Sequence, residues 1–130
     1  MNWLQRFEAP IYAAMRFLFG ALFALHGTQK LFGFPLAARH PLELASQLGV
    51  GAVLELVCGA LIAIGLFTRP AAFVASGMMA VAYFQFHEGY KVAALHWLPP
   101  VNHGEPAVMY CFVFLLIAAR GAGRFALDRK

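Results

Sequence analysis

Four long apolar stretches, separated by short polar segments, make up most of the chain. The stretches are residues 11–31, 49–67, 71–86 and 107–119. A helix needs about 20 mostly apolar residues to cross a bilayer, and shorter ones are tolerated where the bilayer thins or flanking side chains snorkel. The stretches are rich in Ala and Leu and lack the alternation that a membrane β-barrel needs. We predict an all-α protein with one transmembrane helix for each stretch, at about residues 10–32, 49–68, 70–88 and 105–120.

Prolines lie between these stretches and mark the connections, because proline lacks a backbone N–H and clashes with the preceding helical turn. The second and third stretches are joined only by residues 68–70, which predicts a tight antiparallel hairpin. The other two connections are longer, and an up-down-up-down bundle puts both on the same side of the membrane. In the first of them we expect residues 41–48 to form a short helix that lies in the interface, with its leucines toward lipid.

Composition supports the same class of protein. Hydrophobic residues are 62% of the chain and charged residues 12%, against roughly 45–50% and 25% in an average soluble domain. A soluble fold of this size has too few charges to cover so much apolar surface.

The Lys and Arg residues indicate the orientation, because positively charged loops stay in the cytoplasm. In a four-helix topology one side holds Arg6, Arg69, Arg120, Arg124, Arg129 and Lys130, and the other holds Lys30, Arg39 and Lys91. We therefore predict a multi-pass protein of the bacterial inner (plasma) membrane, with both termini cytoplasmic and the two longer loops outside. The formal charge of +4 is then mainly a topology signal with some attraction to anionic lipid, and nothing suggests nucleic acid as a partner.

Polar residues inside the first apolar stretch follow a helical repeat. Arg16, Gly20, Phe23, Gly27 and Lys30 are spaced by four, three, four and three residues, which puts them on one face of a helix. Two glycines and two cations on one stripe predict a face that is turned toward protein.

Glu55 is the acidic residue inside the second apolar stretch, and Gly51 and Gly59 lie four residues to either side of it. Small residues at this spacing let another helix backbone approach closely. An unpaired acid near the centre of a membrane helix costs about 2.5–3.5 kcal/mol. We therefore expect Glu55 to face inward and to be paired or protonated.

The rise of about 1.5 Å per residue in a helix indicates which cations reach Glu55. His26 lies at a similar depth and Lys30 is just above it, so we favour a cluster of these three residues. Arg16 is closer to the cytoplasmic side and is a second candidate partner.

The histidines and cysteines carry weaker signals. All five histidines fall on the non-cytoplasmic side of the predicted topology: His26, His40, His87, His96 and His103. Imidazoles there suit a metal, a haem or a proton relay, but none has HxxxH or HxH spacing, so ordinary loop and helix-end roles are favoured over a metal. Cys58 and Cys111 lack a CxxC spacing and are expected to be small apolar packing residues.

Several segments together resemble the DoxX family of small four-helix membrane proteins. The opening motif covers residues 16–20 and 26–34, and the resemblance continues through Glu55 with Gly59, residues 65–72 and His87. Residues 121–128 are similar to the family's terminal Gly-x-Gly-x-x-x-x-Asp. The resemblance extends over essentially the whole chain and implies a single DoxX-like domain over residues 1–130.

The resemblance implies a membrane subunit of a redox or quinone-linked system. The residues that such a site would use, carried over by position, are Arg16, His26, Lys30, Glu55 and His87. The sequence contains no CxxC, no CxxCH and no dinucleotide glycine loop. Any electron chemistry therefore needs a partner or a bound quinone.

Two hypotheses of different kinds stay open, and they differ on whether the protein is part of an enzyme. In the first, a pocket toward the non-cytoplasmic side accepts a quinone or a similar apolar molecule. Glu55, His26 and Lys30 would be the catalytic set that exchanges a proton and hydrogen-bonds a carbonyl. The cofactor-binding set would be Arg16, Phe23, Tyr83 and His87, with Phe84 and Phe86 as further aromatic walls.

In the second hypothesis the protein is a non-catalytic accessory or scaffold subunit. Glu55 and the cations would then lock the bundle as structural ion pairs. The small residues Ala72, Ser76 and Ala80 would pack against a membrane or peripheral partner, or against a second copy of the chain.

Overall fold

The structure is a computed structural model that describes residues 2–37, 41–87 and 89–128. Within these ranges all regular structure is helical, which confirms the predicted all-α class. The elements are α1 (Asn2–Gln5), α2 (Glu8–Phe32), α3 (Gln47–Ile64), α4 (Thr68–Phe86), the 3-10 turn η1 (Ala93–Leu95), α5 (Pro99–Asn102) and α6 (Glu105–Arg120). The four long helices lie close to the four predicted ranges. The predictions for Arg39, His40, Arg129 and Lys130 concern residues outside those described.

Two details of the predicted connections were wrong. Gly65 ends α3 in the left-handed conformation, so the α3–α4 link is residues 65–67 rather than 68–70. Pro70 instead falls in the first turn of α4, where a missing N–H breaks no helical hydrogen bond. Residues 41–48 do not form a separate helix: Ser46 is the N-cap of α3, and its hydroxyl accepts a hydrogen bond from the Gly49 N–H at 3.1 Å.

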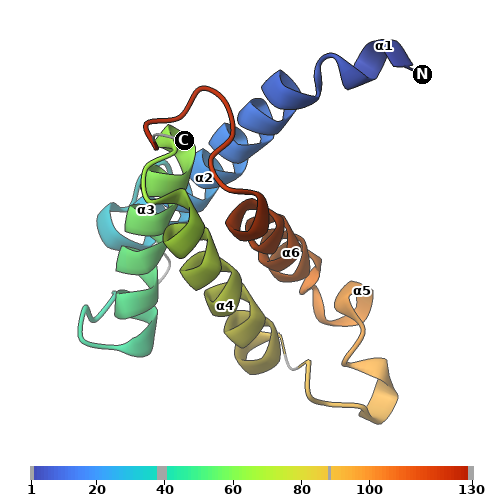
Figure 1. Cartoon of the computed structure of the whole chain (residues 1–130). Coiled ribbons are helices and arrows are strands. Elements are labelled where there is room, and N and C mark those ends of the chain that lie inside the picture. Colours follow the sequence, from blue (N-terminus) through green and yellow to red (C-terminus); the bar gives the residue numbers. More distant parts are fainter. Residues whose placement is uncertain (1, 38–40, 88, 129–130) are drawn as a thin grey trace.

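The long helices pack mainly in two pairs, α2 with α3 and α4 with α6, and α3 also contacts α4 (Figure 1). Glycines allow the close approach of α2 and α3. A Cβ atom on Gly59 would lie 2.4 Å from the backbone nitrogen of Ala24, and one on Gly20 would lie 2.5 Å from that of Ala63. The predicted inward stripe of α2 is confirmed, since Arg16 and Phe23 are each only 1% exposed.

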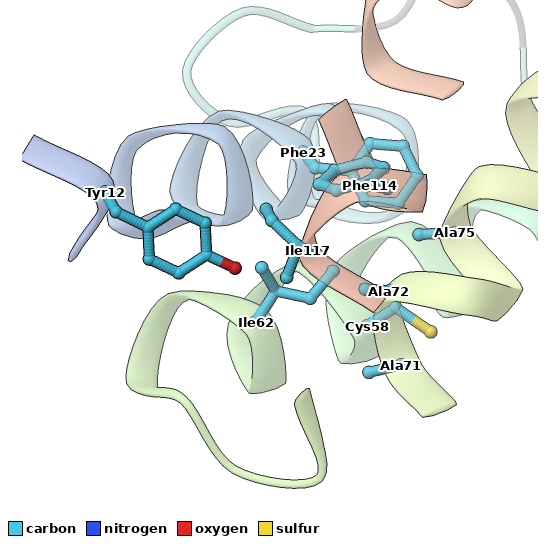
Figure 2. Close-up of a cluster of buried hydrophobic side chains, with 9 residues drawn as sticks. All are labelled: Tyr12, Phe23, Cys58, Ile62, Ala71, Ala72, Ala75, Phe114 and Ile117. Atoms are coloured by element: carbon cyan, nitrogen blue, oxygen red, sulfur yellow. The ribbon is translucent and has the colours of Figure 1, made fainter. Parts of the chain in front are cut away.

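A small hydrophobic core joins the two helix pairs (Figure 2). Its members are Tyr12, Phe23, Cys58, Ile62, Ala71, Ala72, Ala75, Phe114 and Ile117. The rings of Phe23 and Phe114 meet edge to face, with centroids 4.8 Å apart. Cys58 is a free thiol buried in this core, which agrees with its expected packing role.

The small-residue face of α4 is used inside the chain, contrary to the expectation that it packs against a partner. Ala72 and Ser76 are buried, and the Ser76 hydroxyl donates a hydrogen bond to the carbonyl of Cys111 on α6 at 2.8 Å. Small side chains let α4 and α6 approach closely, so this face is already covered by the fold.

The outer surfaces of the helices are strongly apolar. Large side chains such as Phe17, Leu18, Phe73 and Phe112 are each more than half exposed. By length and composition, α2 and α3 are able to cross a membrane, and these are the two such helices among the described residues. The spanning of α4 and α6 stays a prediction.

Residues 121–128, which we call the C-terminal strap, fold back over the ends of the long helices (Figure 1). Asp128 accepts hydrogen bonds from the backbone N–H groups of Phe67 and Thr68, at 2.8 and 2.9 Å, at the start of α4. Its own N–H donates to the carbonyl of Gly65 at 2.7 Å. The hydrogen bond from the Thr68 backbone N–H, together with the one from Phe67 and the nearby Arg16 cation, holds the pKa of Asp128 below its ordinary value. The strap therefore joins α6 back to the α3–α4 turn.

Candidate functional site

A cavity of about 750 Å³ lies between α2, α3, α4 and α6, in the half of the molecule away from the C-terminal strap. Most of its wall is apolar. The apolar side chains include Leu54, Met78, Met79, Ala82, Phe86 and Ala107. Against this background, a few polar groups are the features that give the site its chemistry.

An ion pair is built into the cavity wall. The Lys30 ammonium donates to both carboxylate oxygens of Glu55, at 2.7 and 2.9 Å. The Glu55 side chain is 7% exposed and that of Lys30 is 39% exposed, so the acid is sheltered while the ammonium opens toward the cavity. The predictions that Glu55 faces inward and is paired are confirmed, with Lys30 of the favoured cluster as its partner. The ring of His26, the third member of that cluster, meets that of Tyr110 instead.

Lys30 on α2 and Glu55 on α3 lie side by side because a glycine in α2 lets the two helix backbones approach closely there. Gly27 lies one turn before the end of α2, and a Cβ there would be 2.6 Å from the backbone nitrogen of Leu56. This close contact of the backbones places the Lys30 side chain beside Glu55. Gly51, by contrast, has no backbone close to its Cβ position, which lies 4.0 Å from the tip of the Met78 side chain, and it forms part of the cavity wall.

Two histidines and a tyrosine are further polar groups of the cavity wall. His26 lines the cavity and meets the ring of Tyr110 edge to face, with centroids 6.1 Å apart. His87 lines the cavity from the end of α4, and its Nδ1 lies 3.2 Å from the carbonyl oxygen of Asn102. The imidazoles thus approach the cavity from α2 and α4, on different sides.

A pair of amides links α3 and α4 beside the cavity. The Gln47 side chain donates to that of Gln85 at 2.5 Å. Gln47 and the N-cap residue Ser46 both line the cavity. The start of α3 is therefore part of the site, because Ser46 caps this helix instead of belonging to a separate interfacial one.

The structure brings together five of the seven residues proposed for the site. Phe23, His26, Lys30, Glu55 and His87 all line the cavity. Phe23 is also part of the core, where its ring contacts that of Tyr110 with centroids 5.6 Å apart.

Arg16 lies outside the lining of this cavity and does not pair with Glu55. One of its guanidinium nitrogens donates to the carbonyls of Ile62 and Ala63, at 2.6 and 2.7 Å, and the other donates to that of Phe125 at 2.7 Å. The last carbonyls of a helix have no partner within the helix. The two terminal nitrogens of Arg16 therefore cap α3 and hold the strap, while its buried Nε has no described hydrogen-bond partner. This corrects the predicted place of Arg16 in the site.

Tyr83 also lies outside the cavity lining. Its hydroxyl donates to the carbonyl of Trp97 and accepts a hydrogen bond from the Asn102 side chain at 3.3 Å. Tyr83 thus fastens the α4–α6 connection instead of forming an aromatic wall. Phe84 is half exposed and not among the lining residues, whereas Phe86 is among them.

Sequence reasoning missed Tyr110, a lining residue with a hydroxyl group, as well as Ser46 and Gln47 at the start of α3. Tyr110 is the one hydroxyl-bearing residue in the apolar stretch 107–119, and a hydroxyl within hydrocarbon is a signal that could have found it. Met78 and Met79 carried no such signal, because apolar residues in an apolar stretch do not show which of them face a cavity.

A metal centre has no geometric support in the described ranges. There, no three His, Cys, Asp or Glu side chains are grouped so that they could hold an ion. His96 and His103 lie in the α4–α6 connection and do not line the cavity, and His40 is outside the described residues.

The fold and the site define a small all-helical membrane protein with a ligand-sized, mostly apolar cavity and a half-buried ion pair in its wall. Comparison with known proteins agrees with this class. The DoxX family model matches residues 11–88, so the chain belongs to the DoxX family, a family of small membrane proteins. A protein from Haemophilus influenzae described as "Uncharacterized protein" is 38% identical over 137 aligned positions, which cover 100% of this chain and 97% of the relative. No solved structure matches.

Proposed function

We propose that the protein crosses the bacterial inner membrane four times and binds an apolar, carbonyl-bearing molecule of the quinone class in the cavity beside Lys30 and Glu55. In this role it is a membrane subunit of a redox system. The observation that carries the proposal is an ion pair with a buried carboxylate and a part-exposed ammonium in the wall of an otherwise apolar, ligand-sized cavity.

The size and lining of the cavity suit such a ligand. Small-molecule sites are typically about 300–1,000 Å³, mostly apolar, with a few placed polar groups, and this cavity of about 750 Å³ fits that description. Leu54, Met78 and Phe86 offer apolar surface to a ring and the start of an isoprenoid tail.

Lys30 and Glu55 supply complementary chemistry at one point of the wall. An ammonium has three N–H donors, and two of the Lys30 donors are engaged by Glu55. The third is available to a quinone carbonyl oxygen, and the carboxylate is placed to relay a proton to it. Reduction of a quinone to a quinol takes up two electrons and two protons. The electrons would come from a redox partner protein, and His26 or His87 would pass on the second proton.

The test measures quinone binding directly. The purified protein in a neutral detergent is titrated with decylubiquinone, and binding is followed by quenching of tyrosine and tryptophan fluorescence. Glu55→Gln should weaken binding about tenfold, which corresponds to about 1.4 kcal/mol, and the helical circular dichroism should be retained.

Glu43→Gln is the matched control. Glu43 is exposed and does not line the cavity, so its loss should change affinity by less than about twofold. Equal binding by wild type and Glu55→Gln, or no binding of decylubiquinone by the wild type, would refute the quinone site.

A second candidate function is that of a non-catalytic scaffold subunit. It is favoured by Arg16, a buried cation whose described hydrogen bonds all go to backbone carbonyls of the chain itself. If the Lys30–Glu55 pair has the same structural role, Glu55→Gln should lower the thermal unfolding midpoint while no quinone is bound by either form.

A further inference from the structure

A second cavity of about 610 Å³ lies at the opposite end of the helices from the Lys30–Glu55 pair. It is formed by the first turns of α2 and α4, the last residue of α6 and the C-terminal strap. Three arginines line it: Arg69, Arg120 and Arg124. None of the groups of the proposed quinone site contributes to it, so the two cavities are independent features.

The lining carries a net positive charge. Asp128 is the one acidic side chain among the lining residues, so the three arginines and one carboxylate give a net +2. The Asp128 oxygens are occupied by the N–H groups of Phe67 and Thr68. Glu8, which is not among the lining residues, forms an ion pair with Arg120 at 2.6 Å and offsets one of the three positive charges.

The guanidinium groups are held in place but keep unused donors. Arg69 donates to three carbonyls at the end of α6, at 3.0 Å to that of Ala118, 2.6 Å to that of Ala119 and 3.2 Å to that of Arg120. Arg120 lies over the Tyr12 ring, 4.1 Å from its centroid. A guanidinium has five N–H donors, so each of these arginines retains capacity after these contacts.

Arg124 has the most capacity of the three. It is exposed, and its described contact is with the Phe125 ring, 5.8 Å from the centroid. Beside it, the backbone N–H groups of Ala122 and Gly123 make no hydrogen bond within the described part of the chain. Arginine forks and successive backbone N–H groups are both well suited to phosphate oxygens.

The surroundings of this cavity are those of a membrane boundary. Phe67 lines the cavity and is 65% exposed, and Phe125 in the strap is 74% exposed. The apolar outer surface of α4 begins directly beyond, with Phe73 at 67% exposed. A ligand with a phosphate in the cavity and acyl chains along this surface would satisfy both features.

We propose that this arginine-lined cavity binds a phosphate group, carried either by the headgroup of an anionic phospholipid or by a soluble phosphate. Each Lys or Arg near a membrane surface contributes roughly 1 kcal/mol to the binding of anionic lipid. Loss of one arginine therefore weakens binding about fivefold.

Native mass spectrometry of the full chain in a neutral detergent tests the proposal. The wild type should retain phosphatidylglycerol in preference to phosphatidylcholine, and Arg124→Gln should weaken the retention of phosphatidylglycerol about fivefold. Arg124 has no described hydrogen bond to lose, so its substitution leaves the fold intact. Arg6→Gln is the matched control: it removes the same charge at an exposed position outside the cavity and should change retention little.

Competition with inorganic phosphate distinguishes the two sources. Phosphatidylglycerol that resists displacement by millimolar phosphate identifies a lipid headgroup as the ligand. A higher unfolding midpoint with phosphate than with chloride at equal ionic strength, together with displacement of the lipid, identifies a soluble phosphate. The proposal is overturned if phosphatidylglycerol is bound no better than phosphatidylcholine and phosphate acts no differently from chloride. It is equally overturned if Arg6→Gln weakens retention as much as Arg124→Gln.

Discussion

At the scale of single residues, two cations from the same stripe of α2 have different roles. Lys30 pairs with Glu55 beside an open cavity, whereas Arg16 is enclosed and donates to three backbone carbonyls. The difference follows from their positions. Arg16 lies beside the end of α3, where carbonyls without helical partners and the negative end of the helix dipole attract a cation.

We expect Arg16→Leu to lower the free energy of unfolding by about 3 kcal/mol, because hydrogen bonds to charged groups contribute about 1.5–3 kcal/mol and buried carbonyls would lose their donor. The measurement is reversible unfolding in mixed micelles, followed by circular dichroism. Arg6→Leu, at an exposed position, should stay within about 0.5 kcal/mol of the wild type. Similar losses in both variants would contradict a specific capping role for Arg16.

At the scale of elements, the contact between α2 and α3 depends on glycines that leave no room for a side chain. A Cβ atom on Gly59 would lie 2.4 Å from the backbone nitrogen of Ala24 on α2. Gly77 in α4 has no heavy atom within 4 Å of its Cβ position, so a side chain added there would meet open space.

Gly59→Ala should therefore destabilise the fold by about 1–3 kcal/mol, as overpacking does. Gly77→Ala should be neutral or stabilising by up to about 1 kcal/mol, because alanine is the better helix former. Thermal unfolding of the two variants side by side measures the difference. If Gly59→Ala is tolerated as well as Gly77→Ala, the close approach of α2 and α3 is wrong.

At the scale of the whole molecule, the chain has a different kind of cavity at each end. The cavity beside Lys30 and Glu55 is mostly apolar, and the one beneath the C-terminal strap is lined by arginines. The positive-inside rule predicts that the arginine-lined end faces the cytoplasm. In the proposed topology, the apolar cavity then faces the other side of the membrane.

A topology experiment tests this arrangement. A fluorescent protein fused after residue 130 should fluoresce in bacterial cells, because it folds in the cytoplasm, and alkaline phosphatase fused at the same point should be inactive. Alkaline phosphatase inserted in the α4–α6 connection should be active. The reverse pattern of reporter activity would contradict cytoplasmic termini.

The sequence by itself determined the helices and the need of Glu55 for a partner. Apolar stretches and prolines act locally, so the four long helices could be placed within a few residues. Few ionisable groups lie within the apolar stretches, and an unpaired acid is unfavourable there, so depth narrowed the favoured partners of Glu55 to His26 and Lys30. The structure decided that Lys30 is the one that pairs with it.

Only the tertiary structure decided the contacts that depend on which backbone groups come together. The partners of Arg16 are carbonyls, and every residue has a carbonyl, so no residue type in the sequence identifies them. The same holds for Tyr83, whose hydroxyl donates a hydrogen bond to a backbone carbonyl of the α4–α6 connection. Tyr110 faces the cavity and Ser76 faces α6 because of how the helices are rotated about their axes. That rotation is set by the packing of all the helices together, which a single helical pattern does not contain.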